Sequence, residues 1–317
     1  MRTALIFGVS GQDGAYLSQF LLEKGYAVHG ASRDAARQPF TRLQALGIRD
    51  RVVTHTASRS LIDDVRPDEI YNLAGLSSVA LSFKEPEAAR ASIVDAQRGL
   101  LELLRSHPNT RLYHSASSEC FGDVPRGSAA DERTAFAPRS PYAAAKAEAH
   151  RATVEAREAH GLFAVSGIVF NHESPLRGDA FVTKKIVAAA AAAAEGQLTS
   201  RLALGDLTAS RDWGYAPEYV EAMWLMLQQE RPGDFVIATG ESRTVDEFAA
   251  AAFAEFGLDH RDHIAVDRAL FRPSDIHYSR GNPARAYECL GWEPRTKFAD
   301  LVRLLADAER VARPLVV

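Results

Sequence analysis

A tyrosine and a lysine four residues apart give the sequence its clearest chemical signal. Tyr142 and Lys146 lie in the segment Ser140–Lys146 (SPYAAAK), which predicts the start of a helix. Residues at this spacing share one helical face. An ammonium group near a phenol favours the phenolate and lowers its pKa, so Tyr142 is expected to act as a base near neutral pH. Lys146 is also expected to hold a ribose. The plainer alternative is a surface pair on a solvated helix.

A second cluster precedes this helix and strengthens the functional interpretation. Ser115-Ala116-Ser117-Ser118-Glu119 follows an apolar run that predicts a strand, Arg111–Ser115. In open parallel sheets, ligands bind at the carboxyl ends of the strands. Hydroxyl groups and a carboxylate there would meet the Tyr–Lys pair across one cleft.

The glycine-rich segment Gly8-Val9-Ser10-Gly11-Gln12-Asp13-Gly14 follows the first expected strand and opens the first expected helix. Glycines at this spacing permit a tight turn and a close approach of the backbone to a pyrophosphate, and the helix N-terminus supplies N–H groups. The segment predicts a dinucleotide site; a plain glycine-rich turn is the alternative. The expected contacts from this turn are Gly8, Ser10, Gly11, Gln12, Asp13 and Gly14.

The end of the second expected strand reads Ala31-Ser32-Arg33-Asp34. NAD-binding folds usually place an acidic residue there for the ribose hydroxyls. Ser32 and Arg33 instead suit a 2′-phosphate, which favours NADP as the cofactor. Asp34 keeps NAD open, because a shift of one residue would bring its carboxylate to the ribose.

These residues are positioned by alternating strands and helices. The alternation predicts an α/β fold, a Rossmann-type doubly wound parallel sheet with a smaller α/β substrate-binding domain. We expect a dinucleotide-binding domain over residues 1–170, with a returning segment near 205–240, and a nucleotide-sugar-binding domain over 171–317. The expected strands are Ala4–Phe7, Ala27–Ala31, Val52–Thr54, Glu69–Leu73, Arg111–Ser115 and Phe163–Val169. The expected helices are Tyr16–Lys24, Leu61–Val65, Ile93–Ser106, Pro141–Ala159 and one containing Ala188–Ala194 that ends at Gly196.

Composition narrows the class of protein. The chain has 317 residues, a formal charge of −4, 46% hydrophobic and 25% charged residues, which is typical of a packed globular protein. Its scattered arginines give no reason to expect a nucleic-acid partner. No signal peptide or membrane-spanning stretch is expected. Cys120 and Cys289 form neither a disulfide framework nor metal-ligand spacing, so we expect a cytoplasmic protein without a metal site.

Taken together, the glycine turn, the strand-end hydroxyl cluster and Tyr-x-x-x-Lys resemble the extended short-chain dehydrogenase/reductase family, which modifies nucleotide sugars. Within it, the chain is most similar to the GDP-mannose 4,6-dehydratases, and the similarity spans nearly the whole chain. It is carried by Gly8–Gly14 with Tyr16-Leu17, Ser115–Glu119, Pro138–Lys146, Phe170–Pro175, Phe181–Ile186, Arg211–Gly214, Tyr219–Gln228, Ala238–Gly240 and Phe271–Pro273.

This resemblance implies a lyase with an internal redox cycle. Tyr142 would take the proton of the sugar C4 hydroxyl as hydride passes to NADP⁺, and Glu119 would remove the C5 proton. Water would leave from C6 with Glu119 as acid and Ser117 assisting, and the hydride would return to C6. Such a cycle regenerates the cofactor, so NADP would stay bound. Glu119 is the informative residue, because reductases and epimerases of the family require no carboxylate there; a local loop hydrogen bond is its alternative role.

The resemblance also implies positions around both ligands. Leu73 and Ala74 would line the cofactor, together with Tyr142 and Lys146. Residues implied for the diphosphate of GDP-mannose or a related GDP-sugar are Asn171, Lys185, Arg211 and Arg272, with Arg177 a weaker candidate; those implied for the sugar are Ser82 and Glu173. His172 is equally well explained as a structural histidine, and no catalytic role is assigned to it.

Four departures from the family pattern keep other functions open. Ser117 replaces a threonine, Leu76 replaces a glutamine near the sugar, and Thr54–Ser58 replaces a Gly-Asp-Leu segment. Arg33-Asp34 replaces paired arginines that reach a neighbouring subunit in tetrameric members, so a homodimer is favoured over a homotetramer. The alternatives are a 4-ketoreductase, an epimerase, a 4,6-dehydratase of another GDP-hexose or a GDP-heptose, and a non-catalytic NADP sensor. The last is disfavoured because Tyr142 and Lys146 are both present.

Overall fold

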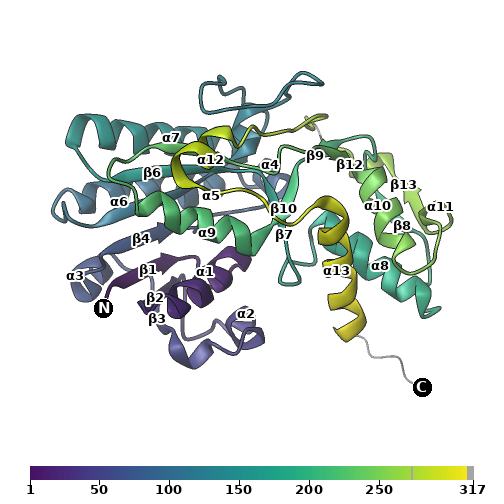
Figure 1. Cartoon of the computed structure of the whole chain (residues 1–317), viewed down its shortest axis with the longest axis horizontal. Helices are drawn as coiled ribbons and strands as arrows, with labels where there is room; N and C mark the ends of the chain where they lie inside the picture. The colour runs from purple at the N-terminus through teal and green to yellow at the C-terminus, as the bar shows by residue number, and fades with distance from the viewer. Residues whose placement is uncertain (273, 313–317) are drawn as a thin grey trace.

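Seven parallel strands form the central sheet of the computed structural model, which describes residues 1–272 and 274–312. Pro273 and residues 313–317, parts of the expected substrate region, lie outside the described residues. The strand order is β11-β6-β5-β4-β1-β2-β3 (Figure 1). The strands are β1 (Thr3–Phe7), β2 (Ala27–Ser32), β3 (Val53–Thr56), β4 (Glu69–Asn72), β5 (Arg111–Ser117), β6 (Ala164–Val169) and β11 (Asp234–Ile237). The predicted fold class is confirmed.

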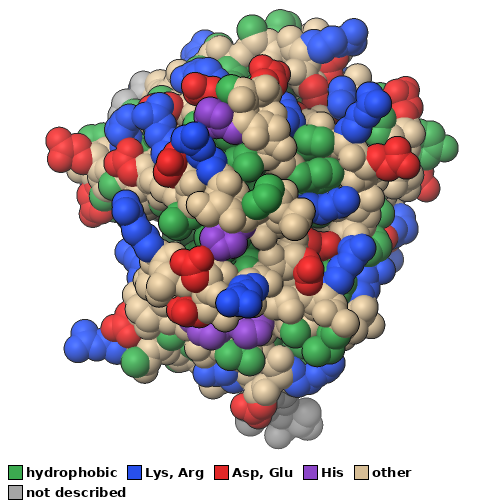
Figure 2. Space-filling model, turned by 90° about the vertical axis from the view of Figure 1, so that its left-hand side faces the viewer, with side chains coloured by type: hydrophobic (Ala, Val, Ile, Leu, Met, Phe, Trp, Pro, Cys, Tyr) green, Lys and Arg blue, Asp and Glu red, His purple; other side chains and the backbone are tan. Residues whose placement is uncertain are grey.

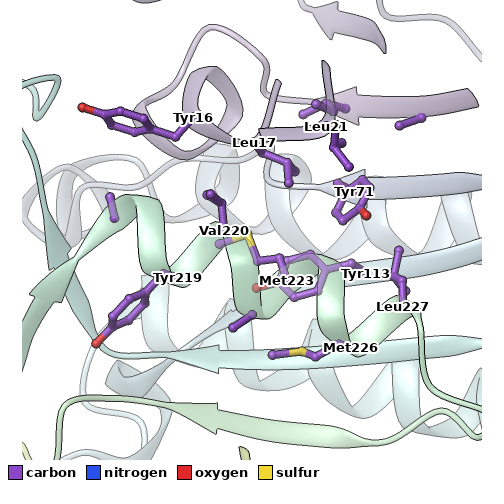
Figure 3. Packing of buried hydrophobic residues seen from close by; sticks show 14 of the residues in the cluster. Tyr16, Leu17, Leu21, Tyr71, Tyr113, Tyr219, Val220, Met223, Met226 and Leu227 are labelled. Atoms are coloured by element: carbon purple, nitrogen blue, oxygen red, sulfur yellow. The ribbon is translucent and has the colours of Figure 1, made fainter. Parts of the chain in front are cut away.

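One face of the sheet is covered by α1 (Gln12–Glu23) and α9 (Ala216–Leu227), which pack against each other. Figure 3 shows Tyr71 and Tyr113 of the sheet in the same cluster as Val220 and Met223 of α9, with Tyr113 next to Met223. All these side chains are buried because the apolar face of each helix closes on a sheet that has no solvated face there. The short helices α2 (Thr41–Ala45) and α12 (Ala284–Leu290) and the 3₁₀ turn at Arg49–Arg51 lie around this layer.

The opposite face is covered by α3 (Leu61–Val65), α6 (Ala96–Leu104) and α7 (Pro141–His160). Two further short helices, α4 (Val79–Lys84) and α5 (Pro86–Arg90), lead into α6 through a π-helical turn at Ala91–Asp95. The predicted helices are therefore confirmed in type. Their bounds differ: α1 begins at Gln12, within the glycine-rich segment Gly8–Gly14, and the helical stretch expected from Ile93 starts earlier.

A second set of elements builds its own hydrophobic core around Phe248, Phe253 and Leu301. In Figure 1 these elements lie beside the sheet, with α8, α10 and α13 packed together. The predicted alanine-rich helix is α8, which ends at Ala194, and Gly196 follows it in the left-handed region (φ +67°). The set comprises β7 (Asn171–Glu173), α8 (Val182–Ala194), β8 (Leu202–Leu204), β9 (Ser210–Arg211), β10 (Trp213–Tyr215), β12 (Arg243–Thr244), α10 (Val245–Ala254), α11 (His260–His263), β13 (Ile264–Val266), a 3₁₀ turn (Arg268–Leu270) and α13 (Phe298–Ala312).

The chain crosses between the two sets more than once. After β10 it returns to the sheet for α9 and β11, and β11 pairs in parallel with β6. Asp234 of β11 accepts two hydrogen bonds of 2.8 Å from the Arg157 guanidinium. At the open edge of β11, the carboxylate of Glu132 accepts the Val236 N–H at 2.7 Å. The sheet is therefore completed by residues more than sixty positions beyond its sixth strand.

The surface carries both charge signs. On the face in Figure 2, Lys and Arg side chains are interspersed with Asp and Glu, and no area of a single sign stands out. Within residues 1–272 and 274–312, no helix has the length and apolar character needed to cross a membrane. Over the same residues, no group of three or more His, Cys, Asp and Glu side chains is arranged to hold a metal ion.

Candidate active site

The strand-end cluster and the Tyr–Lys helix meet at the carboxyl end of β5. β5 ends at Ser117, and a 3₁₀ turn, Ser118–Phe121, carries Glu119. α7 starts at Pro141 because Ser140 caps it, accepting the Ala143 N–H at 3.1 Å. This cap fixes the first turns of α7, and with them Tyr142 and Lys146, against the end of β5.

Lys146 is held by the backbone of β5. Its Nζ donates to the Ser115 carbonyl at 2.6 Å and lies 5.9 Å from the centre of the Tyr142 ring. Burial lowers the pKa of Lys146 to about 8, since no carboxylate in the described part of the chain pairs with the ammonium to offset its desolvation. The lysine is therefore close to losing its proton within the physiological range.

The Tyr142 phenol does not have the lowered pKa expected from the sequence. Burial raises its pKa well above the ordinary value, although a hydrogen bond with Ser117 acts in the opposite direction. The expectation that Lys146 lowers the pKa of this phenol is not met, because the Lys146 ammonium donates to the Ser115 carbonyl. The Tyr142 N–H donates to Ser82 Oγ at 3.1 Å, which places the buried Ser82 directly behind the phenol-bearing turn.

Glu119 completes this cluster. Burial raises the pKa of its carboxyl group, while Arg211 and Arg272 act to lower it and Asp275 acts to raise it. The carboxyl group is thus close enough to all three residues for their charges to shift its pKa. Its own charge in turn raises the pKa of Tyr142. The four predicted catalytic residues, Ser117, Glu119, Tyr142 and Lys146, are brought together.

The glycine turn packs tightly against the end of β4. Gly8 has a positive φ of +86°, and a Cβ there would lie 2.9 Å from the Leu73 carbonyl carbon and 3.0 Å from the Ala74 nitrogen. A Cβ on Gly14 would lie 2.4 Å from the Gly8 oxygen. Only glycine fits both positions. Leu73 and Ala74 therefore adjoin the turn, with Gly11 as the N-cap of α1.

The end of β2 fits a phosphorylated ribose. The buried Ser32 Oγ has no hydrogen-bond partner within the described part of the chain, and Arg33 beside it is exposed. Asp34, whose register was in question, accepts the Arg37 N–H at 3.2 Å. An unpaired buried hydroxyl next to an exposed guanidinium offers donors for a 2′-phosphate, so these residues fit a dinucleotide.

Arg211 and Arg272 converge on Asp275. Arg211 lies 3.0 Å and Arg272 3.7 Å from its carboxylate. Arg211 is buried and also donates to the carbonyls of Ser210 and Ile276 at 3.0 and 2.7 Å. Both guanidiniums therefore already have an anionic partner close to Glu119.

The other predicted substrate residues have separate surroundings. Asn171 and Glu173 lie on β7. The carboxylate of Glu173 is buried, accepts the Thr183 hydroxyl at 2.6 Å and pairs with Arg177 at 3.1 Å. Lys185 is exposed on α8. Glu173 and Arg177 thus form an ion pair apart from the arginine pair at Glu119, although the buried Arg177 Nε makes no hydrogen bond within the described residues.

Comparisons with known proteins identify the family of this chain. A family model described as GDP-mannose 4,6 dehydratase matches residues 5–305. The chain belongs to this family. GDP-mannose 4,6 dehydratase 2 of Arabidopsis thaliana is 45% identical, covering 97% of this chain and 87% of the relative. The GDP-mannose 4,6 dehydratase of Homo sapiens is 39% identical, covering 97% and 91%.

Solved structures show the same fold. The UDP-glucose 4-epimerase of Thermus thermophilus, in complex with NAD, superposes with a TM-score of 0.85 at 25% identity, covering 98% of this chain and 99% of the epimerase. The predicted membership of the GDP-mannose 4,6-dehydratase family is confirmed over nearly the whole length.

Two features of this family member were missed from the sequence. Asp275, three residues after Arg272, joins the two arginines. Asp212 accepts hydrogen bonds from Thr239, Gly240 and Gly281, although burial still raises its pKa to about 6. The spacing of Arg272 and Asp275 is a weak local signal for the role of Asp275. No local sequence signal marks the role of Asp212.

Proposed function

We propose that the chain is an NADP-dependent GDP-mannose 4,6-dehydratase, a hydro-lyase that converts GDP-mannose to GDP-4-keto-6-deoxymannose. The observation that carries this proposal is the position of Glu119. A dehydratase needs a carboxyl group that works as base and then as acid, and Glu119 has a raised pKa beside the Tyr142 phenol. Family membership over residues 5–305 supports the same activity.

Tyr142 and Ser117 handle the first proton. In its phenolate form Tyr142 accepts the proton of the C4 hydroxyl, and the hydrogen bond from the Ser117 hydroxyl favours that form against the effect of burial. Lys146, fixed by the Ser115 carbonyl, is placed to hold the nicotinamide ribose. A nicotinamide held at the glycine-rich segment would supply hydride chemistry at C4 and C6. The proton held by Tyr142 would return to C5, which closes the proton balance of the cycle.

Glu119 handles the elimination. A ketone at C4 acidifies the C5 proton, which the carboxylate removes, and the protonated carboxyl then gives the proton to the C6 hydroxyl as water leaves. A pKa raised by burial suits both halves of this cycle. Arg211 and Arg272 would bind the diphosphate in place of Asp275, and Asn171 and Lys185 would extend this site. Ser82 and Glu173 are proposed to support the sugar side.

The choice of NADP over NAD rests on the end of β2. Ser32 offers an unpaired buried hydroxyl within the described residues, Arg33 an exposed guanidinium, and Asp34 is occupied by the Arg37 backbone. The glycine turn and the Leu73-Ala74 backbone would hold the pyrophosphate and the adjoining ribose. Ser32→Asp is expected to shift the ratio of the two dissociation constants toward NAD by about tenfold, measured by fluorescence titration; an unchanged ratio would contradict this assignment.

We also propose a cytoplasmic homodimer. Cys120 is buried and Cys289 is exposed, and both are free thiols, as expected in a reducing compartment. The single arginine of Arg33-Asp34 supports a dimer over the tetramer implied by paired arginines. Light scattering coupled to size exclusion distinguishes the two assemblies.

Incubation of the purified protein with GDP-mannose, with and without added NADP⁺, tests the activity. Mass spectrometry should show loss of one water with no net change in NADPH. Net NADPH consumption would indicate a 4-ketoreductase instead. Unchanged GDP-mannose beside bound NADP would point to another GDP-hexose or GDP-heptose, an alternative favoured by Leu76 and Ser117 at the positions of the family's glutamine and threonine.

A further inference from the structure

The side chains of Gln12 and Asp13 extend from the glycine turn to strand β7. Gln12 Nε2 donates to the His172 carbonyl at 3.1 Å, and Gln12 Oε1 accepts the Ser174 hydroxyl at 2.7 Å. Asp13 Oδ2 lies 2.9 Å from His172 Nε2. Side-chain hydrogen bonds from Gln12 and Asp13 therefore connect the dinucleotide turn to β7, the strand that carries Asn171 and Glu173.

The contact between Asp13 and His172 is an ion pair. His172 Nδ1 lies 2.7 Å from the Phe170 carbonyl, which can only accept. The ionised Asp13 carboxylate also only accepts, so both ring nitrogens carry a proton and the imidazole is charged. Burial alone would lower the pKa of His172, but Asp13 outweighs it and raises that pKa; His172 in turn lowers the pKa of Asp13 to about 2 against the effect of burial.

A second bridge runs beside the pair. Arg42 donates to the Ser10 carbonyl at 3.1 Å and to the Leu176 carbonyl at 2.8 Å. It thus links the middle of the glycine turn with the loop that follows β7. The turn is therefore held to this segment at points separate from the ion pair.

From β7 the connection continues to the diphosphate side of the site. β7 pairs in parallel with β10, with Asn171 opposite Trp213 and His172 opposite Gly214. Tyr219 of α9 stacks on His172 at 4.7 Å, and a Cβ on Gly214 would lie 2.3 Å from this tyrosine ring. Since β10 follows Arg211 after one residue, a displacement of β7 would move Asn171 directly and Arg211 through β10.

We propose that the buried Asp13–His172 ion pair couples the dinucleotide site to the nucleotide-sugar site, so that each ligand binds more tightly when the other is present. A pyrophosphate bound at the start of α1 would order the turn that holds Asp13, and the pair would transmit this order to β7 and β10. The coupling is reciprocal, as any linkage between two binding equilibria must be. The inference rests on the proposed function, because it assumes a dinucleotide at the turn and a nucleotide sugar at Arg211.

Calorimetric titration of nucleotide-free protein with GDP, in the absence and presence of saturating NADP⁺, measures the coupling. For the wild type we expect NADP⁺ to tighten GDP binding by about tenfold. In His172→Asn and Asp13→Asn the factor should fall below about twofold. His260→Asn is the matched control, since it removes another His–Asp pair, His260–Asp246 at 3.1 Å, that lies between α10 and α11.

The outcomes separate the two claims. Wild-type protein that binds neither GDP nor NADP⁺ contradicts the proposed function. Wild-type protein that binds both independently, or variants that keep the wild-type factor, overturn the coupling alone. Should neither variant fold, hydrogen exchange of the wild type decides: NADP⁺ alone should slow amide exchange in the peptide containing β7, and unchanged exchange there overturns the inference.

Discussion

Two buried clusters of titratable groups lie along the same edge of the sheet, and they are built in opposite ways. At the end of β5, burial lowers the pKa of Lys146 and raises the pKa values of Glu119 and Tyr142. At the start of α1, His172 is buried and Asp13 half-buried, and each shifts the pKa of the other toward the charged form. In the first cluster burial shifts every pKa toward the neutral form, whereas in the second the two partners hold each other in the charged form. Unpaired burial favours proton transfer, and paired burial favours a fixed geometry.

The largest expected effect is on turnover, in the cluster of Lys146, Glu119 and Tyr142 at the end of β5. Tyr142→Phe removes the phenol that accepts the C4 proton, so kcat should fall by roughly 10³–10⁴-fold. The free energy of unfolding should change little, because the ring and its packing remain. Steady-state assays and thermal unfolding of the same sample check both halves. Activity near the wild-type level would remove Tyr142 from the proposed mechanism.

Glu119→Gln should also abolish most turnover, by roughly 10²–10³-fold. Because burial disfavours the charged carboxylate, the neutral amide should leave the melting temperature unchanged or higher. Mass spectrometry should show no loss of water from GDP-mannose. A clear fall in melting temperature would show instead that the Glu119 carboxylate stabilises the fold, as the Asp13–His172 ion pair is expected to do.

The reverse pattern is expected in the paired cluster. His172→Asn leaves the Asp13 carboxylate buried without its partner, which should reduce the free energy of unfolding by about 3–5 kcal/mol. This loss should depend on pH. Since the pKa of His172 is raised in the folded protein, the pair's stabilisation is complete below the free histidine value of about 6.5 and is lost as pH rises through the folded pKa.

Denaturant unfolding of the wild type and His172→Asn across this range measures the difference. The gap in free energy of unfolding should narrow toward alkaline pH. At the acid end, the contribution of Asp13 should disappear as pH falls toward about 2. A gap that stays constant from acid to alkaline pH would contradict the ion pair.

The smallest effect concerns Lys146. Its folded pKa of about 8 lies below that of the unfolded chain, about 10.4, so between these values the unfolded state binds more protons. Stability should therefore rise with pH across that window because of this one group. Lys146→Met should remove this part of the slope in a pH series of unfolding curves, and an unaltered slope would show that Lys146 is not desolvated as described.

The sequence was sufficient to predict six strands of the sheet, the longer helices of its first half and the meeting of Tyr142, Lys146, Ser117 and Glu119, but not the strand β11. These depend on periodic patterns and on the rule that parallel strands end at one edge. It failed on the electrostatics of the Tyr–Lys pair. Helical spacing places two side chains on one face, but it cannot show that the Ser115 carbonyl, 31 positions upstream, binds the ammonium.

The Asp13–His172 pair could not be predicted from the sequence, for a similar reason. The two residues are 159 positions apart, and nothing in the local pattern of either joins them. Gln12 and Asp13 were taken as cofactor contacts because they lie in the glycine turn, and their side chains in fact point to β7. If they contact the dinucleotide, they do so through the backbone N–H groups at the start of α1.

The late position of β11 in the chain has a consequence for how this protein is made. The sheet gains its final strand only at Asp234–Ile237, and the buried Trp292 still has to close against the Glu218 carbonyl of α9, 2.8 Å from its indole N–H. During synthesis the N-terminal half therefore leaves the ribosome with the exposed edge of β6 and an uncovered apolar face. A fragment ending near residue 170 should aggregate when expressed alone, whereas one extended through Trp292 contains every strand of the sheet.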